Sequence, residues 1–356
     1  MKIFYGIAGE GLGHATRSRP LIQYLLKRHS VRIFAGGKAF VYLQRWFNVE
    51  RIESMRLKYS ENKMSALKTV VYNVLKSPWH FFSFLKVFSF MFRNPPDVVV
   101  TDFEPWSAWS AIILRIPLIS IQLPGHYLPP QPFLRNKQSP AKIGLQKHNW
   151  WTSVTLWVVT TITIPYADAV VIPSFFQIPL TDKRAQYVEP IIRNEIVKRK
   201  SVVGDNVLVY QTSGTYHELL RVLKQFPQQQ FVVYGFAKMG IEQNIVFKSF
   251  NEDEFFDDLC SSKAVITNGG ISLMTEAVFL GKPVLSIPIR GHGEQLVNAF
   301  FLEKTGNGCA ANTVSKFVVG SFLKNINLHK NVGKKSWRVE KTFASIDEII
   351  NLLGSA

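Results

Sequence analysis

Residues 264–287, AVITNGGISLMTEAVFLGKPVLSI, contain a complete structural unit in one short stretch. The apolar run 264–267 predicts a buried strand, the glycine pair a turn, 273–280 a helix, and 284–287 a second strand. Two strands joined by a crossover helix lie parallel in one sheet. Parallel strands are buried on both faces, so an apolar run without alternation is expected there. The stretch therefore predicts an α/β fold.

The same alternation of strand and helix continues on both sides of this unit. Further strands are predicted at 2–8, 31–35, 97–101, 117–122, 169–172, 207–211, 231–234 and 245–247, with helices at 20–29, 106–114, 216–226, 252–261 and 294–305. Residues 173–205 hold three prolines and a basic run and are predicted to be a linker, which makes 169–172 the last strand of the first half.

We therefore predict two Rossmann-like, doubly wound domains that face each other across a cleft. Residues 1–185 form the first, 186–335 the second, and 336–356 a C-terminal helix that could pack back on the first domain. In open parallel sheets ligands bind beyond the carboxyl ends of the strands, so the cleft is the expected site.

Composition narrows the class of protein. A chain of 356 residues with 47% apolar and 19% charged residues is too long for one core and too apolar to be disordered. Residues 1–180 carry 21 basic and 8 acidic side chains, a net charge of +13 out of +17, which favours an anionic partner such as nucleic acid or a membrane. Only Cys260 and Cys309 are present, which excludes a disulfide scaffold and a cysteine metal site. Met1 leads directly into a strand, so no signal peptide is predicted.

A glycine-rich loop follows the first predicted strand. Residues 9–14 read GEGLGH, in which His14 stands where a dinucleotide fingerprint has its third glycine. The second strand runs into residues 35–37, AGG, without the acidic residue that would hold a ribose. The pattern argues against an NAD site, although Gly11 and Gly13 allow the backbone to approach a ligand closely. A plain tight turn is the alternative.

A second turn, Ser213-Gly214-Thr215, lies between a predicted strand and a predicted helix. The free N–H groups and the dipole of such a helix start attract an anion, and an ordinary helix cap is the alternative interpretation.

Polar and glycine residues then recur in a chemically coherent order over 267–299. The set comprises Asn268, Gly269, Gly270, Ser272, Glu276, Glu294 and Gln295. The glycines and the Ser272 hydroxyl can wrap a phosphate, Glu276 can accept both ribose hydroxyls, and Glu294 with Gln295 can bind the hydroxyls of a sugar. Each residue alone has an ordinary structural explanation, but the complete order favours a binding site.

This order resembles the donor-binding signature of nucleotide-sugar glycosyltransferases of the GT-B fold, read as H-G-G-x-x-S, E-A, G-x-P, P and D-Q-x-x-N-A. Within that fold the chain resembles the group related to the enzyme that forms peptidoglycan lipid II by adding N-acetylglucosamine. The loop 9–14 is similar to that group's N-terminal glycine loop, and residues 96–105, PDVVVTDFEP, resemble a segment of poorly characterised relatives. Asn268 and Glu294 depart from the usual histidine and aspartate, but both keep hydrogen-bonding groups.

The resemblance also assigns roles outside the signature. Residues 190–193, PIIR, are similar to a linker motif whose arginine approaches the diphosphate, which implies that role for Arg193. Phe250 lies near where relatives contact the base, and a core position is its alternative.

His14 is the candidate general base, because histidine accepts a proton readily near neutral pH and the family places its base on this loop. Asp102 ends a strand of the same sheet and could orient the imidazole, with a helix cap or an ion pair as its alternatives. Gly11, Gly13 and His126 are assigned to the acceptor side, and His126 is the alternative general base. No metal or other cofactor is expected, because a metal-binding D-x-D belongs to another transferase fold.

The acceptor side is predicted to meet a membrane. Residues 67–92 hold eight aromatic residues and three lysines with no acid, which is typical of an interfacial helix. Residues 105–167 also lack any acid, and 149–166 form an uncharged run that contains three tryptophans. Core helices with solvated lysines are the alternative interpretation of both segments.

The leading hypothesis is an inverting, metal-independent glycosyltransferase that uses a UDP-sugar and a lipid-linked or glycan acceptor. We expect it at the cytoplasmic face of an anionic membrane, without a nucleic-acid partner; the oligomeric state is left open. The alternatives are a nucleotide-sugar 2-epimerase of the same fold, a non-catalytic basic module that binds membrane or nucleic acid, and an inactive sensor of sugar nucleotides.

Overall fold

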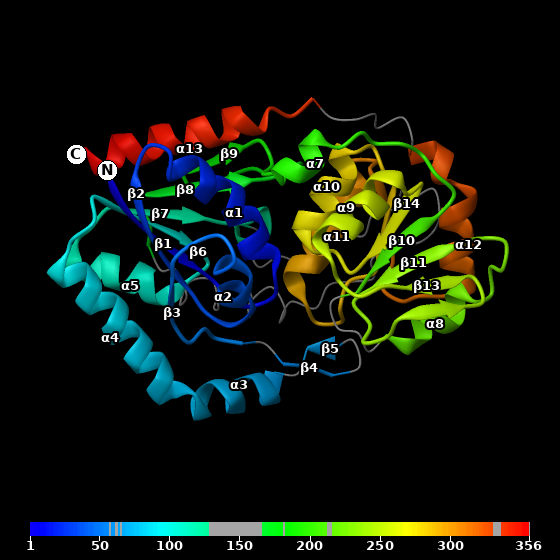
Figure 1. The fold of residues 1–356 in the computed structure, drawn as a ribbon, viewed down its shortest axis with the longest axis horizontal. Coiled ribbons are helices and arrows are strands. Elements are labelled where there is room, and N and C mark those ends of the chain that lie inside the picture. The colour runs from blue at the N-terminus through cyan, green and yellow to red at the C-terminus, as the bar shows by residue number, and fades with distance from the viewer. Residues whose placement is uncertain are drawn as a thin grey trace.

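Two seven-stranded sheets stand side by side in the structure, a computed structural model (Figure 1). It describes residues 1–56, 58–60, 63–64, 66–127, 166–180, 182–211, 216–329 and 336–355. The predicted α/β class and the two Rossmann-like sheets are confirmed.

The first sheet has the order β3-β2-β1-β6-β7-β8-β9, and all its neighbouring strands are parallel. Its strands are β1 (Lys2–Ile7), β2 (Ser30–Ala35), β3 (Val49–Arg51), β6 (Val98–Asp102), β7 (Leu118–Ile121), β8 (Ala169–Pro173) and β9 (Ala185–Val188). The short hairpin β4 (Tyr59–Ser60) and β5 (Lys63–Met64) stands apart from it. The direction of strand addition reverses between β1 and β6, which makes this the switch point where such sheets bind ligands.

The second sheet has the order β12-β13-β11-β10-β14-β15-β16, and only its edge strand β12 is antiparallel. Its strands are β10 (Val207–Tyr210), β11 (Phe231–Tyr234), β12 (Gly240–Glu242), β13 (Ile245–Phe247), β14 (Ala264–Thr267), β15 (Val284–Ser286) and β16 (Gly308–Ala310). Its switch point lies between β10 and β14.

Helices cover both faces of each sheet. They are α1 (Gly13–Leu25), α2 (Gly37–Leu43), α3 (Ala66–Leu75), α4 (Ser77–Arg93), α5 (Pro105–Leu114), α7 (Asn194–Lys198), α8 (His217–Leu223), α9 (Glu252–Ser261), α10 (Ile271–Phe279), α11 (Gly293–Lys304), α12 (Lys316–Lys324) and α13 (Val339–Gly354), with 3-10 turns at Pro124–Tyr127 and Ile326–His329. On the first sheet, α1 and α13 pack on one face and α4 and α5 on the other. The core that contains α1 and α13 continues through Ile192 and Ile196 into α9 and α10, so the two halves share one apolar interior.

The last helix returns to the first half. In Figure 1, α13 (red) runs along the first sheet, and its Phe343 and Ile346 are buried with the side chains of β1 and α1. Asp347 accepts from the Nε2 of His29 at 2.6 Å and from Arg28 at 3.2 Å. These contacts fix α13 against the turn that follows α1.

Two sequence expectations need correction. The strand 169–172 is not the last of the first sheet, because β9 pairs with β8, and the sheet therefore runs past residue 185 into the predicted linker. The first helix begins at Gly13 rather than at residue 20, so His14 lies in its first turn and Pro20 inside it. The short strands β3, β4, β5, β9, β12 and β16 were not predicted. Among the helices described, none is long and apolar enough to pass through a bilayer.

Candidate active site

Each switch point carries a pair of hydrogen-bonded polar side chains. At the first sheet, β1 leads through the glycine loop to His14, and β6 ends at Asp102; the Nδ1 of His14 lies 2.7 Å from the Asp102 Oδ1. At the second sheet, Gln211 follows β10 and Asn268 follows β14, and the Asn268 Nδ2 donates to the Gln211 Oε1 at 2.5 Å. The sequence predicted His14, Asp102 and Asn268 but not Gln211.

Asp102 is fully buried and accepts from three side chains of α1. Besides His14, Arg17 donates its Nε at 2.8 Å and Ser18 its hydroxyl at 2.9 Å, both to Oδ2. An Arg17 Nη2 also pairs with Oδ1 and lies 3.1 Å from the His14 Nδ1. Burial would raise the pKa of Asp102, but the charges and hydrogen bonds of Arg17 and His14 hold it well below its usual range. The carboxylate is therefore ionised and fixed.

Arg17 connects this cluster to the second half of the chain. Burial would lower the pKa of Arg17, but the carboxylates of Asp102 and Glu294 raise it. Glu294 lies in the first turn of α11, so its charge acts on Arg17 across the junction of the two halves. The predicted residue Glu294 is therefore close enough to Arg17 for its charge to act on the guanidinium.

A left-handed residue shapes the end of β6. Phe103 has φ +60°, a conformation that costs about 1–2 kcal/mol outside glycine, and such strain concentrates at functional sites. Its ring lies 5.9 Å from the His14 imidazole, nearly parallel to it. The turn brings the Glu104 carboxylate to the start of α5, where it accepts from the N–H groups of Trp106 at 2.9 Å and of the next residue at 2.7 Å. Burial raises the pKa of Glu104.

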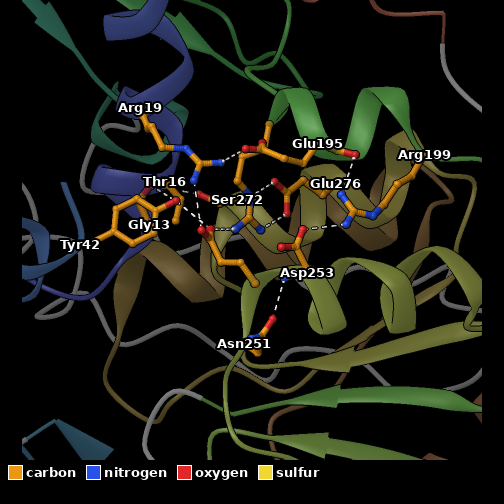
Figure 2. A network of polar contacts seen from close by, with 12 residues as sticks. Gly13, Thr16, Arg19, Tyr42, Glu195, Arg199, Asn251, Asp253, Ser272 and Glu276 are labelled. Carbon is orange, nitrogen blue, oxygen red and sulfur yellow. Dashed lines mark hydrogen bonds and ion pairs between the residues drawn. The ribbon is translucent and has the colours of Figure 1, made fainter. Parts of the chain in front are cut away.

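The two glycine turns meet at the junction of the halves. The Ser272 hydroxyl of α10 donates to the Gly13 carbonyl of α1 at 3.3 Å, and Figure 2 shows both residues. A Cβ built on Gly11 or Gly270 would meet no atom within 4 Å, so open space adjoins both turns. Gly11 has φ +67°, which favours glycine. The backbones here can approach a ligand closely.

The start of α10 has the properties of an anion site. Gly269 has φ +105°, and its carbonyl accepts from the Asn298 side chain at 3.1 Å, which fixes the turn. In the described part of the chain no side chain caps α10, and its first turn contains no acidic residue. Its free N–H groups and positive dipole end therefore remain for a ligand with negative charge.

Glu276 lies further along α10 and is buried in an ion pair. Arg193 donates its Nε and Nη2 to the two Glu276 oxygens, each at 2.6 Å, and its Nη1 to a Glu252 oxygen at 3.2 Å. The Arg193 guanidinium also stacks on the Phe256 ring at 4.5 Å. All three nitrogens of Arg193 thus face carboxylates, whereas the sequence implied a guanidinium directed at a diphosphate.

The ion pairs continue into the first half of the chain. Arg19 of α1 donates to Glu252 at 3.0 Å and to Glu195 at 2.6 Å, and the hydroxyl of Tyr42 donates to Glu252 at 2.8 Å. Figure 2 shows Arg19, Tyr42, Glu195 and Glu276 converging at this point. Arg19 is 2% exposed and stacks on the Trp46 ring at 4.5 Å. Arg19, Tyr42, Glu195 and Glu252, which extend the ion pair of Arg193 and Glu276, were not predicted as site residues.

Other predicted residues fall in several places. Gln295 is buried, and its side-chain Oε1 accepts from the Ile289 N–H at 2.9 Å. This hydrogen bond stabilises the loop between β15 and α11. Phe250 is 42% exposed and 5.3 Å from the Phe255 ring, which rules out a core position. Ser213, Gly214, Thr215 and all but the last residue of 149–166 lie outside the described residues, as does the side chain of His126.

In the parts that are described, no three His, Cys, Asp or Glu side chains could hold a metal ion together. Metal-independent catalysis stays a prediction.

Comparisons with known sequences show the family of the chain. Residues 1–327 match the family described as Glycosyl transferase family 1, and the chain belongs to that family. An uncharacterized glycosyltransferase of Methanosarcina acetivorans is 25% identical over 336 residues, covering 86% of this chain and 85% of the relative. Another, from Methanosarcina mazei, is 26% identical and covers 98% and 96%. The protein is a transferase that acts on sugars.

Solved structures share the fold over its full length. Phytolacca americana UGT2, complexed with UDP-2fluoro-glucose and pterostilbene, has a TM-score of 0.65 at 11% identity and covers 98% of each chain. The calicheamicin glycosyltransferase CalG4 has a TM-score of 0.63 at 15% identity, covering 99% and 98%. MurG of Acinetobacter baumannii has a TM-score of 0.58 at 14% identity and covers 99% of each. The fold is that of the GT-B glycosyltransferases.

Proposed function

We propose that this glycosyltransferase moves a sugar from a UDP-sugar to an acceptor hydroxyl, with inversion and without a metal ion. The observation that carries the proposal is the His14–Asp102 pair, which lies at one switch point and beside the open glycine turn of α10. A base and an anion-binding helix start, contributed by opposite halves, are the two groups that such a transfer needs.

His14 acts as the general base. Because its Nδ1 is held by Asp102, the Nε2 is the nitrogen left to accept the proton of the acceptor hydroxyl. The oxygen then attacks the anomeric carbon, the bond from that carbon to the diphosphate oxygen breaks, and the nucleoside diphosphate leaves. The buried, ionised Asp102 keeps the ring oriented and stabilises the imidazolium that forms.

The second half binds the donor. The uncapped start of α10 and the Ser272 hydroxyl supply N–H and O–H donors for the leaving diphosphate. Glu276 accepts from the ribose hydroxyls, and Glu294 contacts the sugar. A UDP-sugar is favoured because the structural neighbour UGT2 was solved with UDP-2fluoro-glucose.

Substitution of His14 tests the chemistry. We expect His14→Ala to lower turnover about 10²–10⁴-fold while UDP binding is kept, because only general-base catalysis is removed. Turnover is measured as nucleoside diphosphate released from a panel of UDP-sugars with membrane extract. His29→Ala is the matched control, because it removes a second buried His–Asp pair, with Asp347 at 2.6 Å, away from the switch points. If His14→Ala keeps its turnover and His126→Ala loses it, the base is His126. A product epimerised at C2 without an acceptor would indicate the epimerase instead.

The acceptor is proposed to be lipid-linked, and the docking surface to be α3 and α4. Trp79 is 54% and Phe82 67% exposed, and they are joined by exposed Val70, Val74 and Phe92. In Figure 1 these two helices (cyan to blue) form the outer edge of the first half. Lys76 lies 4.6 Å from the Trp79 ring and adds a positive charge to the apolar face. An apolar face with basic residues and no acid suits the surface of an anionic membrane.

Cosedimentation with vesicles tests this surface. Binding should require anionic lipid, weaken in high salt, and fall when Trp79 and Phe82 are both changed to serine. Met239→Ser with Ile241→Ser is the control, because these side chains are 72% and 75% exposed but lie in the second half. If vesicles of every composition leave the protein in solution, the acceptor is a soluble molecule. Binding to nucleic acid without vesicle binding would favour the basic module.

A further inference from the structure

A chain of alternating charges runs from the donor half to the first half of the molecule. It begins at Glu276, continues through Arg193 and Glu252, and ends at Arg19, with contacts of 2.6, 3.2 and 3.0 Å. The side chains of Glu276 and Arg193 are only 3% and 6% exposed. The contacts between Glu276 and Arg193 therefore lie in an interior where water competes little for them, whereas the Glu252 side chain is 16% exposed.

We infer that Arg193 is a positioning residue, which holds the Glu276 carboxylate in the one orientation that accepts the ribose hydroxyls of the donor. This inference rests on the proposed function, because the ribose belongs to the proposed UDP-sugar. The two parallel contacts of 2.6 Å fix both oxygens of Glu276 in the plane of the guanidinium. Each carboxylate oxygen keeps a further acceptor site, so the pair of oxygens stays able to receive a vicinal diol.

The same contacts speak against a direct role of Arg193 at the diphosphate. Its Nε and Nη2 face Glu276 and its Nη1 faces Glu252, so its charge is already balanced by two carboxylates. A guanidinium that binds phosphate needs free donors on one edge. The uncapped start of α10 is the better binding site for the diphosphate. Glu276 lies further along the same helix.

Glu252, the first residue of α9 in the second half, in turn holds Arg193 and is itself held by two side chains of the first half. The Glu252 oxygens accept from Tyr42 at 2.8 Å and from Arg19 at 3.0 Å, and both of these residues belong to helices of the first sheet. The orientation of Glu276 therefore depends, through Glu252, on Arg19 and Tyr42 as well as on Arg193. Substitutions at Glu252 should therefore change ribose recognition, although Glu252 contacts Arg193 and not Glu276.

Calorimetry with two nucleotides on Arg193→Lys tests the inference. Lysine keeps the positive charge inside the cluster but lacks the planar fork that aligns a carboxylate. We expect the affinity for UDP to fall about tenfold or more, because charge-assisted hydrogen bonds to the diol are lost. The affinity for 2′,3′-dideoxy-UDP, which has no diol, should stay within about twofold of the wild type, because a change of 0.4 kcal/mol or less corresponds to that ratio. A role at the diphosphate, or a general loss of structure, would lower both affinities alike.

Two further variants keep the test decisive. Glu252→Gln keeps the shape of the side chain, and it should give a smaller loss that is again confined to UDP. Arg199→Lys is the matched control, because Arg199 stacks on the same Phe256 ring at 5.1 Å but pairs with Asp253 and Asp257 near the surface. It should leave both affinities unchanged. Circular dichroism confirms that each variant is folded.

The outcomes separate this inference from the proposed function. Equal losses for UDP and dideoxy-UDP in Arg193→Lys, or no loss of UDP affinity, overturn the positioning role alone. A wild-type protein that binds UDP and dideoxy-UDP equally also overturns it, because no diol is then recognised. A wild-type protein that binds neither nucleotide overturns the proposed donor and this inference together.

Discussion

Replacement of Asp102 by asparagine should affect both stability and turnover, and the two effects have different causes. The carboxylate is fully buried and balances Arg17, which is 7% exposed. Removing one partner of a buried ion pair leaves an uncompensated charge, which costs about 3–5 kcal/mol. We therefore expect the free energy of unfolding at pH 7 to fall by about that amount. Turnover should fall about 10²–10⁴-fold, because the His14 ring loses the acceptor that orients it.

The pH dependence of this loss has a definite sign. The folded-state pKa of Asp102 is lowered, so its carboxylate contributes stability above the unfolded value of about 3.9. That contribution is lost as the pH falls through the folded pKa. Urea unfolding should therefore show a large gap between wild type and Asp102→Asn at neutral pH, which shrinks as the pH falls below about 4.

A second substitution checks that the cost comes from the ion pair. In Asp102→Asn with Arg17→Met both charges are gone, so the double variant should be less destabilised than the sum of the single variants. Additive costs, or a single-variant loss below about 0.5 kcal/mol, would refute the buried pair, because ordinary surface substitutions give values of that size. A pH-independent gap would refute the assignment of the charge to Asp102.

Three further predictions follow from the site and its surroundings. Glu276→Gln should weaken UDP binding by about 1.5–3 kcal/mol in calorimetry, because a charged acceptor becomes neutral; equal affinities would remove Glu276 from the donor site. Lys282→Met should lower the free energy of unfolding by about 1–3 kcal/mol, because the buried ammonium donates to the carbonyls of Cys260 at 2.8 Å and Ser262 at 2.6 Å and to that of Val202; the partly exposed Lys263→Met is the control in the same urea titration. Excess EDTA should leave turnover unchanged, and activity restored only by added Mg²⁺ would contradict the metal-independent mechanism.

The sequence predicted the regular core of the fold well, because buried parallel strands are continuous apolar runs. The strands β11, β13 and β14 and the helix α9 have the predicted limits. Helix α9 is well marked by Asn251, whose side chain accepts from the Asp253 and Glu254 N–H groups, and by three acidic residues in its first turn. Strand β9, AQYV, is partly exposed and polar at one position, so its sequence does not differ from that of a loop.

The site was predicted less completely, for two physical reasons. The first helix was predicted at 20–29, and proline is common at a helix start, whereas α1 begins at Gly13 and contains Pro20 in its interior. With the helix starting at Gly13, Arg17 lies three residues after His14 on the same face, and this spacing could have identified it. The pair of Arg193 and Glu276 is separated by 83 residues and depends on how the linker meets α10. A contact between residues so far apart cannot be predicted from a local pattern in a single sequence.

The return of α13 to the first sheet has a consequence for how the protein is made. Val339, Phe343, Ile346 and Ile350 of this helix are buried in the same apolar cluster as β1 and α1. A chain emerging from the ribosome therefore completes the second sheet while the face of the first sheet that α1 and α13 cover together still lacks α13. Apolar surface of this kind is prone to aggregate or to recruit chaperones during synthesis. Loss of residues 339–354 would expose to water the apolar side chains of the first half that pack against this helix.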